Sequence, residues 1–85
     1  MKKIIGIKKS EGDYNGQPYC NYSVYYKELE LVKDSVGEIV EKLTIKGVYL
    51  DDILKARNLD SFVKLVGIQF NEIYYDKYQK VRAII

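Results

Sequence analysis

The stretch that decides the fold is residues 19–29, YCNYSVYYKEL. Tyrosine and valine favour strands, and polar residues alternate with them at a period of two. The pattern predicts a strand from Tyr19 to Leu29 with two distinct faces. The face expected to pack in the core comprises Cys20, Tyr22, Val24 and Tyr26. The opposite face comprises Tyr19, Asn21, Ser23, Tyr25 and Lys27.

Strand patterns also lie on both sides of this stretch. Residues 2–9 predict a first strand with Ile5 and Ile7 on one face, in which Gly6 permits sharp curling or a bulge. The turn formers in Ser10–Pro18 predict a loop. Glu38–Lys46 predicts a third strand whose apolar side comprises Ile39, Leu43 and Ile45.

The second half of the chain begins with a change of period. Apolar residues at helical spacing predict a helix over Tyr49–Arg57, with Asp51 and Asp52 near its N-terminus and Asn58 as its stop. Residues 67–75 predict a fourth strand with a bulge near Ile73, and a turn at Asp76–Gln79 leads to a fifth strand over residues 80–85.

The order of three strands, one short helix and two strands predicts a mainly β domain. It matches the OB-fold, a five-stranded, partly open Greek-key barrel. The competing arrangement is an open α+β sheet with the helix on one face. A chain of 85 residues has room for one domain, residues 1–85.

Composition excludes most catalytic chemistry. The chain has no His and one Cys, so it lacks the commonest acid–base residue and metal ligand and forms no internal disulfide. We therefore expect no enzymatic activity, no cofactor and no metal. The apolar runs are far shorter than the ~20 residues that cross a bilayer, so we expect a cytoplasmic protein without membrane contact.

The positions of the charged residues indicate more about function than the net charge does. The net charge is +2. Lysines and arginine gather near both ends of the chain, at Lys2, Lys3, Lys8 and Lys9 and at Lys77, Lys80 and Arg82. If the first and last strands lie side by side, these residues form one basic edge.

An OB-fold meets oligonucleotides on the face of its second and third strands. Unpaired bases stack on aromatic rings for ~1–3 kcal/mol each, and lysines attract phosphates. The residues predicted to bind nucleic acid are Tyr14, Tyr19, Tyr25, Lys27, Lys42, Lys46 and Tyr78. The competing interpretation is that the tyrosines pack in a small core and the lysines protect strand edges.

Other residue groups favour structural roles. Asp51 and Asp52 fit the helix dipole better than a cation site. Glu38 and Glu41 fall on opposite strand faces and form no carboxylate pair. Cys20 is expected to be a small buried apolar side chain.

Asn15-Gly16-Gln17-Pro18-Tyr19, which leads into a tyrosine-rich strand ending in Lys27-Glu28, resembles the gene V type of single-stranded-DNA-binding proteins from filamentous phages. Those OB-related proteins carry Gly-x-Pro-Tyr at the start of their second strand. The resemblance implies a DNA contact near Tyr19 and dimeric, cooperative, sequence-tolerant coating of a displaced strand. The chain is less basic than that family and adds the segment Tyr49–Arg57. It is also similar to small proteins of phages, plasmids and integrative elements from low-GC Gram-positive bacteria.

The sequence therefore predicts a non-enzymatic module that binds single-stranded DNA and acts in replication or transfer of a mobile element. RNA remains open as a ligand. The alternative is an adaptor or inhibitor, encoded by a mobile element, that docks on a host or element protein through the same face. An acidic outward face would favour that alternative.

Overall fold

The computed structural model describes residues 1–30 and 33–85. Its elements are, in chain order, β1 (Lys2–Tyr14), β2 (Gln17–Glu28), β3 (Val40–Lys46), α1 (Gly47–Ala56), the 3₁₀ helix η1 (Phe62–Leu65), β4 (Gln69–Phe70), β5 (Ile73–Tyr75) and β6 (Val81–Ile84). Strands cover 49% of the described residues and helices 17%. The prediction of a mainly β domain with one α-helix is confirmed for the described residues.

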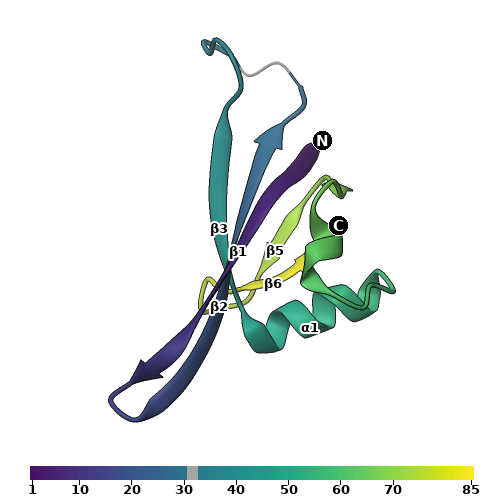
Figure 1. Cartoon of the computed structure of the whole chain (residues 1–85). Coiled ribbons are helices and arrows are strands. Elements are labelled where there is room, and N and C mark those ends of the chain that lie inside the picture. The colour runs from purple at the N-terminus through teal and green to yellow at the C-terminus, as the bar shows by residue number, and fades with distance from the viewer. Residues whose placement is uncertain (31–32) are drawn as a thin grey trace.

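The strands form two open antiparallel sheets. Four strands lie in the order β3-β2-β1-β4, and β5 pairs with β6. The smaller sheet and α1 lie on one side of the long sheet, where β6 contacts both β3 and α1 (Figure 1). This arrangement is compatible with a partly open barrel.

A bulge in β1 sets which isoleucines face the core. Ile4 pairs with Tyr26 and Gly6 with Tyr25, so Ile5 is the extra residue between them. Ile4 is fully buried, Ile7 packs against the core, and Ile5 is 40% exposed. The bulge near Gly6 is confirmed. The prediction that Ile5 and Ile7 share a face is wrong, because the extra residue changes the alternation.

The predicted loop over Ser10–Pro18 is wrong, since most of this segment is paired strand. β1 and β2 remain in register up to Tyr14 and Gln17. Only Asn15 and Gly16 form the turn, with φ values of 50° and 78°. Positive φ at both central residues matches the right-handed twist of a hairpin, so strand pairing continues on both sides.

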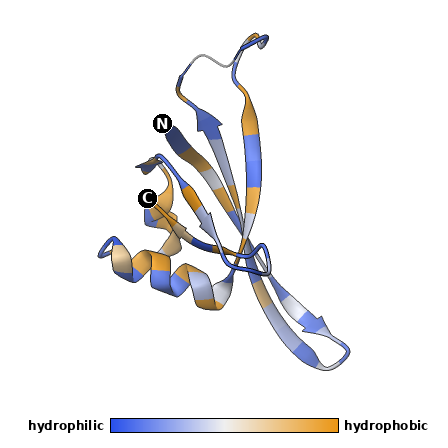
Figure 2. Cartoon of the chain, turned by 180° about the vertical axis from the view of Figure 1, so that it is seen from behind, coloured by the Kyte–Doolittle hydropathy of each residue, from blue (hydrophilic) through white to orange (hydrophobic). Residues whose placement is uncertain are grey.

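The paired segment projects from the body as an arm, which we define as residues 10–21 (Figure 1). The radius of gyration is 13.9 Å. A compact domain of this length has about 12 Å. The arm is mostly hydrophilic, whereas apolar residues gather where the long sheet meets α1 (Figure 2). The arm therefore lies largely outside the core.

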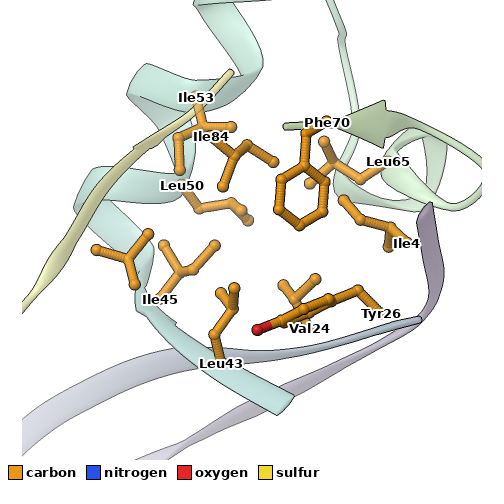
Figure 3. Packing of buried hydrophobic residues seen from close by; sticks show 11 residues of the cluster. Ile4, Val24, Tyr26, Leu43, Ile45, Leu50, Ile53, Leu65, Phe70 and Ile84 are labelled. Carbon is orange, nitrogen blue, oxygen red and sulfur yellow. The ribbon is translucent and has the colours of Figure 1, made fainter. Parts of the chain in front are cut away.

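The core lies between the long sheet, α1, η1 and β6. Its buried residues are Ile4, Val24, Tyr26, Leu43, Ile45, Leu50, Ile53, Leu65, Phe70, Val81 and Ile84 (Figure 3). The Tyr26 ring packs on Phe70 with centroids 5.4 Å apart, and Tyr22 packs on Phe62 at 5.0 Å. The inward face predicted for Val24 and Tyr26 is confirmed. Cys20 is only half-buried, because β2 continues past the core into the arm.

The helix starts earlier than predicted. α1 begins at Gly47, directly after β3, so Asp51 and Asp52 lie in its second turn and not in its first. The expected end is confirmed, because Asn58 follows the cap residue Arg57 with φ 56°.

The predicted fourth strand is split into β4 and β5. Between them, the backbone N–H groups of Asn71 and Glu72 both donate to the carbonyl of Ile85, at 2.6 and 2.9 Å. The turn after β5 is confirmed: Asp76 Oδ1 accepts hydrogen bonds from the N–H groups of Tyr78 at 2.8 Å and Lys80 at 2.9 Å.

Candidate nucleic-acid interface

The first three strands present one continuous surface away from the core, here called the outer face. The pairing register assigns its members by alternation on each strand. From β1 they are Lys3, Gly6, Lys8, Ser10, Gly12 and Tyr14, from β2 Gln17, Tyr19, Asn21, Ser23, Tyr25 and Lys27, and from β3 Val40, Lys42, Thr44 and Lys46. Six of the seven residues predicted to bind nucleic acid belong to this set.

Charge is segregated between the two sides of these strands. Within the described residues of β1, β2 and β3, the outer face carries five lysines and no acidic residue. The acidic residues of the same strands all lie on the opposite side and are Glu11, Asp13, Glu28 and Glu41. The net charge of +2 therefore conceals a surface of one sign.

Most lysines of the outer face have free ammonium groups. Among the described residues, neither an ion pair nor a hydrogen bond reaches the side chains of Lys3, Lys8, Lys42 and Lys46. On the opposite side Lys2 pairs with Glu28 at 3.4 Å, and Lys9 pairs with Glu11 at 3.5 Å. The free charges thus lie on the outer face.

Lys27 is the exception on the outer face. Its Nζ donates to Glu38 Oε1 at 2.8 Å, and Glu38 belongs to the segment that precedes β3. The hydrogen bond from Lys27 and its positive charge lower the pKa of Glu38. Glu38 and Glu41 do lie on opposite sides, because Glu41 Oε2 accepts a hydrogen bond from the Tyr26 hydroxyl at 2.9 Å.

Three tyrosines lie along the outer face. Tyr25 stands between Gly6 on β1 and Lys42 on β3 and is half-buried. The ring of Tyr19 lies over Gly12, because a Cβ at Gly12 would stand 3.0 Å from the Tyr19 hydroxyl oxygen. Tyr19 is 43% exposed. Tyr14 is 73% exposed at the end of the arm.

Small polar side chains fill the centre of the outer face, between Tyr19 and Tyr25. They are Ser10, Asn21, Ser23 and Thr44. Among the described residues no side chain or backbone group forms a hydrogen bond with their side chains. Their donors and acceptors are therefore available to a ligand.

A basic groove borders the outer face beside β3. It has a volume of about 430 Å³ and lies between β3 and the β5–β6 turn. Three lysines line it, Lys42, Lys46 and Lys80, together with Tyr75, and its described lining contains no carboxylate. Its remaining lining residues are Asn21, Leu43, Thr44, Gln79 and Val81.

The structure places the predicted Tyr78 outside this groove. Tyr78 is 68% exposed in the turn, with the Lys77 ammonium 5.1 Å from its ring centroid. The tyrosine that lines the groove is Tyr75, which the sequence interpretation did not single out. Tyr74 and Tyr75 are adjacent in the sequence, and the pairing of β5 with β6 is irregular between them. Alternation along the strand therefore did not indicate which of the two tyrosines lines the groove.

A second groove, of about 690 Å³, shares Asn21 and Lys46 with the basic groove. It follows the edge of β2 past the end of β3 and includes the carboxylates of Glu11 and Asp51. These charges disfavour a phosphate backbone, so the two grooves differ in the ligand that they attract.

The basic edge expected from the two ends of the chain does not form. β1 lies between β2 and β4, whereas β6 pairs with β5, so the first and last strands are not neighbours. Lys80 instead joins Lys42 and Lys46 in the basic groove.

Residues 1–30 and 33–85 contain no group of three or more side chains arranged to hold a metal ion. No helix within the same residues has the length and apolar character needed to cross a membrane.

Comparison with protein-family models, with curated proteins and with solved structures finds no match to this chain. Its function is therefore inferred from its own residues.

Proposed function

We propose that the chain is a non-enzymatic module that binds single-stranded DNA on the outer face, with little dependence on sequence. The observation that carries the proposal is the outer face itself, where four free lysines and three tyrosines share one surface to which β1, β2 and β3 contribute no carboxylate. Single-stranded nucleic acid offers the two complementary groups, since its phosphates attract lysines and its unpaired bases stack on rings.

The dimensions of the outer face suit a short oligonucleotide. From Lys27 to Tyr19 the strand β2 advances about 27 Å, at ~3.4 Å per residue. Modules of this kind cover about 4–16 nucleotides. At one end Tyr25 stands beside Lys42, so one nucleotide can place its base on the ring and a phosphate at the ammonium. The basic groove offers a continuation past β3, with Lys80 and Tyr75.

We also propose an OB-type barrel as the fold. Its support is the order β-β-β-α-β-β, the pairing of β1 with both β2 and β4, and the contact of β6 with β3. A cytoplasmic location is proposed from the short apolar runs of the sequence, and a role in replication or transfer of a phage, plasmid or integrative element is proposed from the resemblance at Gly16-Gln17-Pro18-Tyr19. The basic charge of the outer face favours this proposal over a protein-binding adaptor, which an acidic outward face would have favoured.

A stacking variant tests the proposal. We expect wild-type protein to bind fluorescein-labelled oligo-dT in fluorescence anisotropy at about 50 mM salt, where phosphate contacts are strong. Tyr25→Leu keeps an apolar side chain on the sheet but removes the ring, so its binding free energy should fall by about 1–3 kcal/mol. Tyr74→Leu is the matched control, because Tyr74 is an exposed strand tyrosine that lies on β5, away from the outer face.

The outcomes separate the alternatives. Absence of wild-type binding to oligo-dT contradicts the proposed function and favours the alternative, a protein-binding adaptor or inhibitor. Equal losses in Tyr25→Leu and Tyr74→Leu contradict the assignment to the outer face. Tighter binding of oligo-rU than of oligo-dT identifies RNA as the ligand.

A further inference from the structure

Glu38 is the acidic residue that reaches the outer face from outside its strands. It lies two residues before Val40, the first residue of β3, and its contact with Lys27 brings its carboxylate to the outer face. Its carboxylate contacts Lys27 Nζ at 2.8 Å, and the described residues give neither side chain another ion pair or hydrogen bond. The ammonium of Lys27 is thus occupied before any ligand arrives.

Lys27 is also the lysine for which a counter-charge matters most. In the pairing of β1 with β2 it stands directly opposite Lys3, and like charges at such positions repel one another. A carboxylate beside Lys27 relieves this repulsion in the free protein. A phosphate of a bound strand would supply the same negative charge at the same place.

We propose that Glu38 competes with a ligand phosphate for Lys27 and so limits the affinity of the outer face. The inference rests on the proposed function, because it describes what limits the affinity of the same outer face for its ligand. The competing pair is easily opened, because the Glu38 side chain is 71% exposed and exposed ion pairs contribute little stability. Glu38 therefore lowers affinity without blocking the site, and it leaves Lys3, Lys8, Lys42 and Lys46 unaffected.

The test compares two variants that each remove one carboxylate and free one lysine. Glu38→Gln frees Lys27 on the outer face, and Asp60→Asn frees Lys64 in η1, outside the three strands of that face. Against oligo-dT, Glu38→Gln should bind about three- to fivefold more tightly than wild type, the range that an exposed pair allows. Its plot of log K against log salt should steepen by about 0.7, the slope of one additional phosphate contact. Asp60→Asn should change neither quantity appreciably.

A second substitution identifies the residue through which Glu38 acts. Lys27→Gln should have a small effect in the wild-type background and should cancel the gain in the Glu38→Gln background. A gain equal in both carboxylate variants, or one that survives Lys27→Gln, overturns the competition. If wild type and Glu38→Gln both fail to bind oligo-dT, the proposed function fails, and the competition fails with it. Binding by wild type with no gain in Glu38→Gln overturns the competition alone.

Discussion

Tyr26 places its ring in the core and its hydroxyl against Glu41, an acidic residue on the same side of the sheet. It is 7% exposed, and its hydroxyl donates to Glu41 at 2.9 Å. Burial, followed by the hydrogen bond to Glu41, raises the pKa of Tyr26 from 10.0 to about 12. Because the folded pKa lies above the unfolded one, the stability that this hydroxyl contributes is complete below pH 10 and is lost as the pH rises through 12.

Tyr26→Phe should therefore have different consequences in neutral and alkaline solution. At pH 7 we expect the free energy of unfolding to fall by about 1 kcal/mol, because a net hydrogen bond is lost while the ring remains. Between pH 10 and 12 the difference from wild type should shrink, since wild type loses the contribution of Tyr26 by ionisation. Urea denaturation across this pH range measures both effects. Tyr14→Phe is the exposed control, since Tyr14 is 73% exposed, and equal stability of Tyr26→Phe and wild type at pH 7 would contradict the prediction.

At the scale of the element, the arm is held by one hairpin and little else. β3 ends at Lys46, opposite Asn21, so the paired residues beyond this point have no third strand beside them. Residues 11–19 are all exposed. Segments with few buried contacts open independently of the core, so the arm should be a local unit of low stability.

Gly16→Ala tests the independence of the arm. Gly16 has φ +78°, and no atom lies within 4 Å of the place that a Cβ would take, so the cost of Ala is conformational and not steric. A left-handed conformation costs an L-residue about 1–2 kcal/mol, which should speed amide hydrogen exchange in the arm about fivefold or more. Exchange at Val24 and Tyr26 should not change. Gln17→Ala is the control in the same hairpin, and slower or equal exchange in the Gly16→Ala arm would refute the prediction.

The sequence predicted the elements of the fold better than their ends. Alternation placed Val24 and Tyr26 inward and Tyr25 and Lys27 outward, because a strand with one buried face has a strict period of two. It failed at Ile5, where one extra residue reverses the faces, and at Gly12 and Asp13, whose turn preference yields to hairpin pairing.

In the candidate site, too, the sequence predicted what depends on spacing along one strand and missed the contacts between segments that are distant in the sequence. The lysines of β3 lie on the outer face as their spacing indicated. The basic groove could not be predicted, because Tyr75 and Lys80 meet Lys42 and Lys46 only through the packing of β6 against β3. The contact between Lys27 and Glu38 likewise depends on how the chain returns from β2 to β3.

At the scale of the whole molecule, net charge is a poor guide to the surface that a polyanion meets. The chain carries +2, yet every acidic side chain of β1, β2 and β3 lies on one side of the sheet, and five of the seven lysines of these strands lie on the other. A phosphate backbone responds to the potential of the nearby surface, because salt screens charges beyond about 10 Å at 0.1 M. The outer face should therefore bind as a basic surface although the protein is almost neutral.

This sorting predicts a salt dependence that follows the face and not the total charge. The double variant Lys42→Gln/Lys46→Gln removes two free ammonium groups from the outer face, so the slope of log K against log salt for oligo-dT should become shallower by about 1.4, at ~0.7 per contact. Lys2→Gln/Lys9→Gln removes the same charge from the opposite side, where both lysines are already paired, and should leave the slope unchanged. Anisotropy titrations over several salt concentrations measure the slopes. If both double variants change the slope equally, binding depends on net charge alone, and the outer face loses its special role.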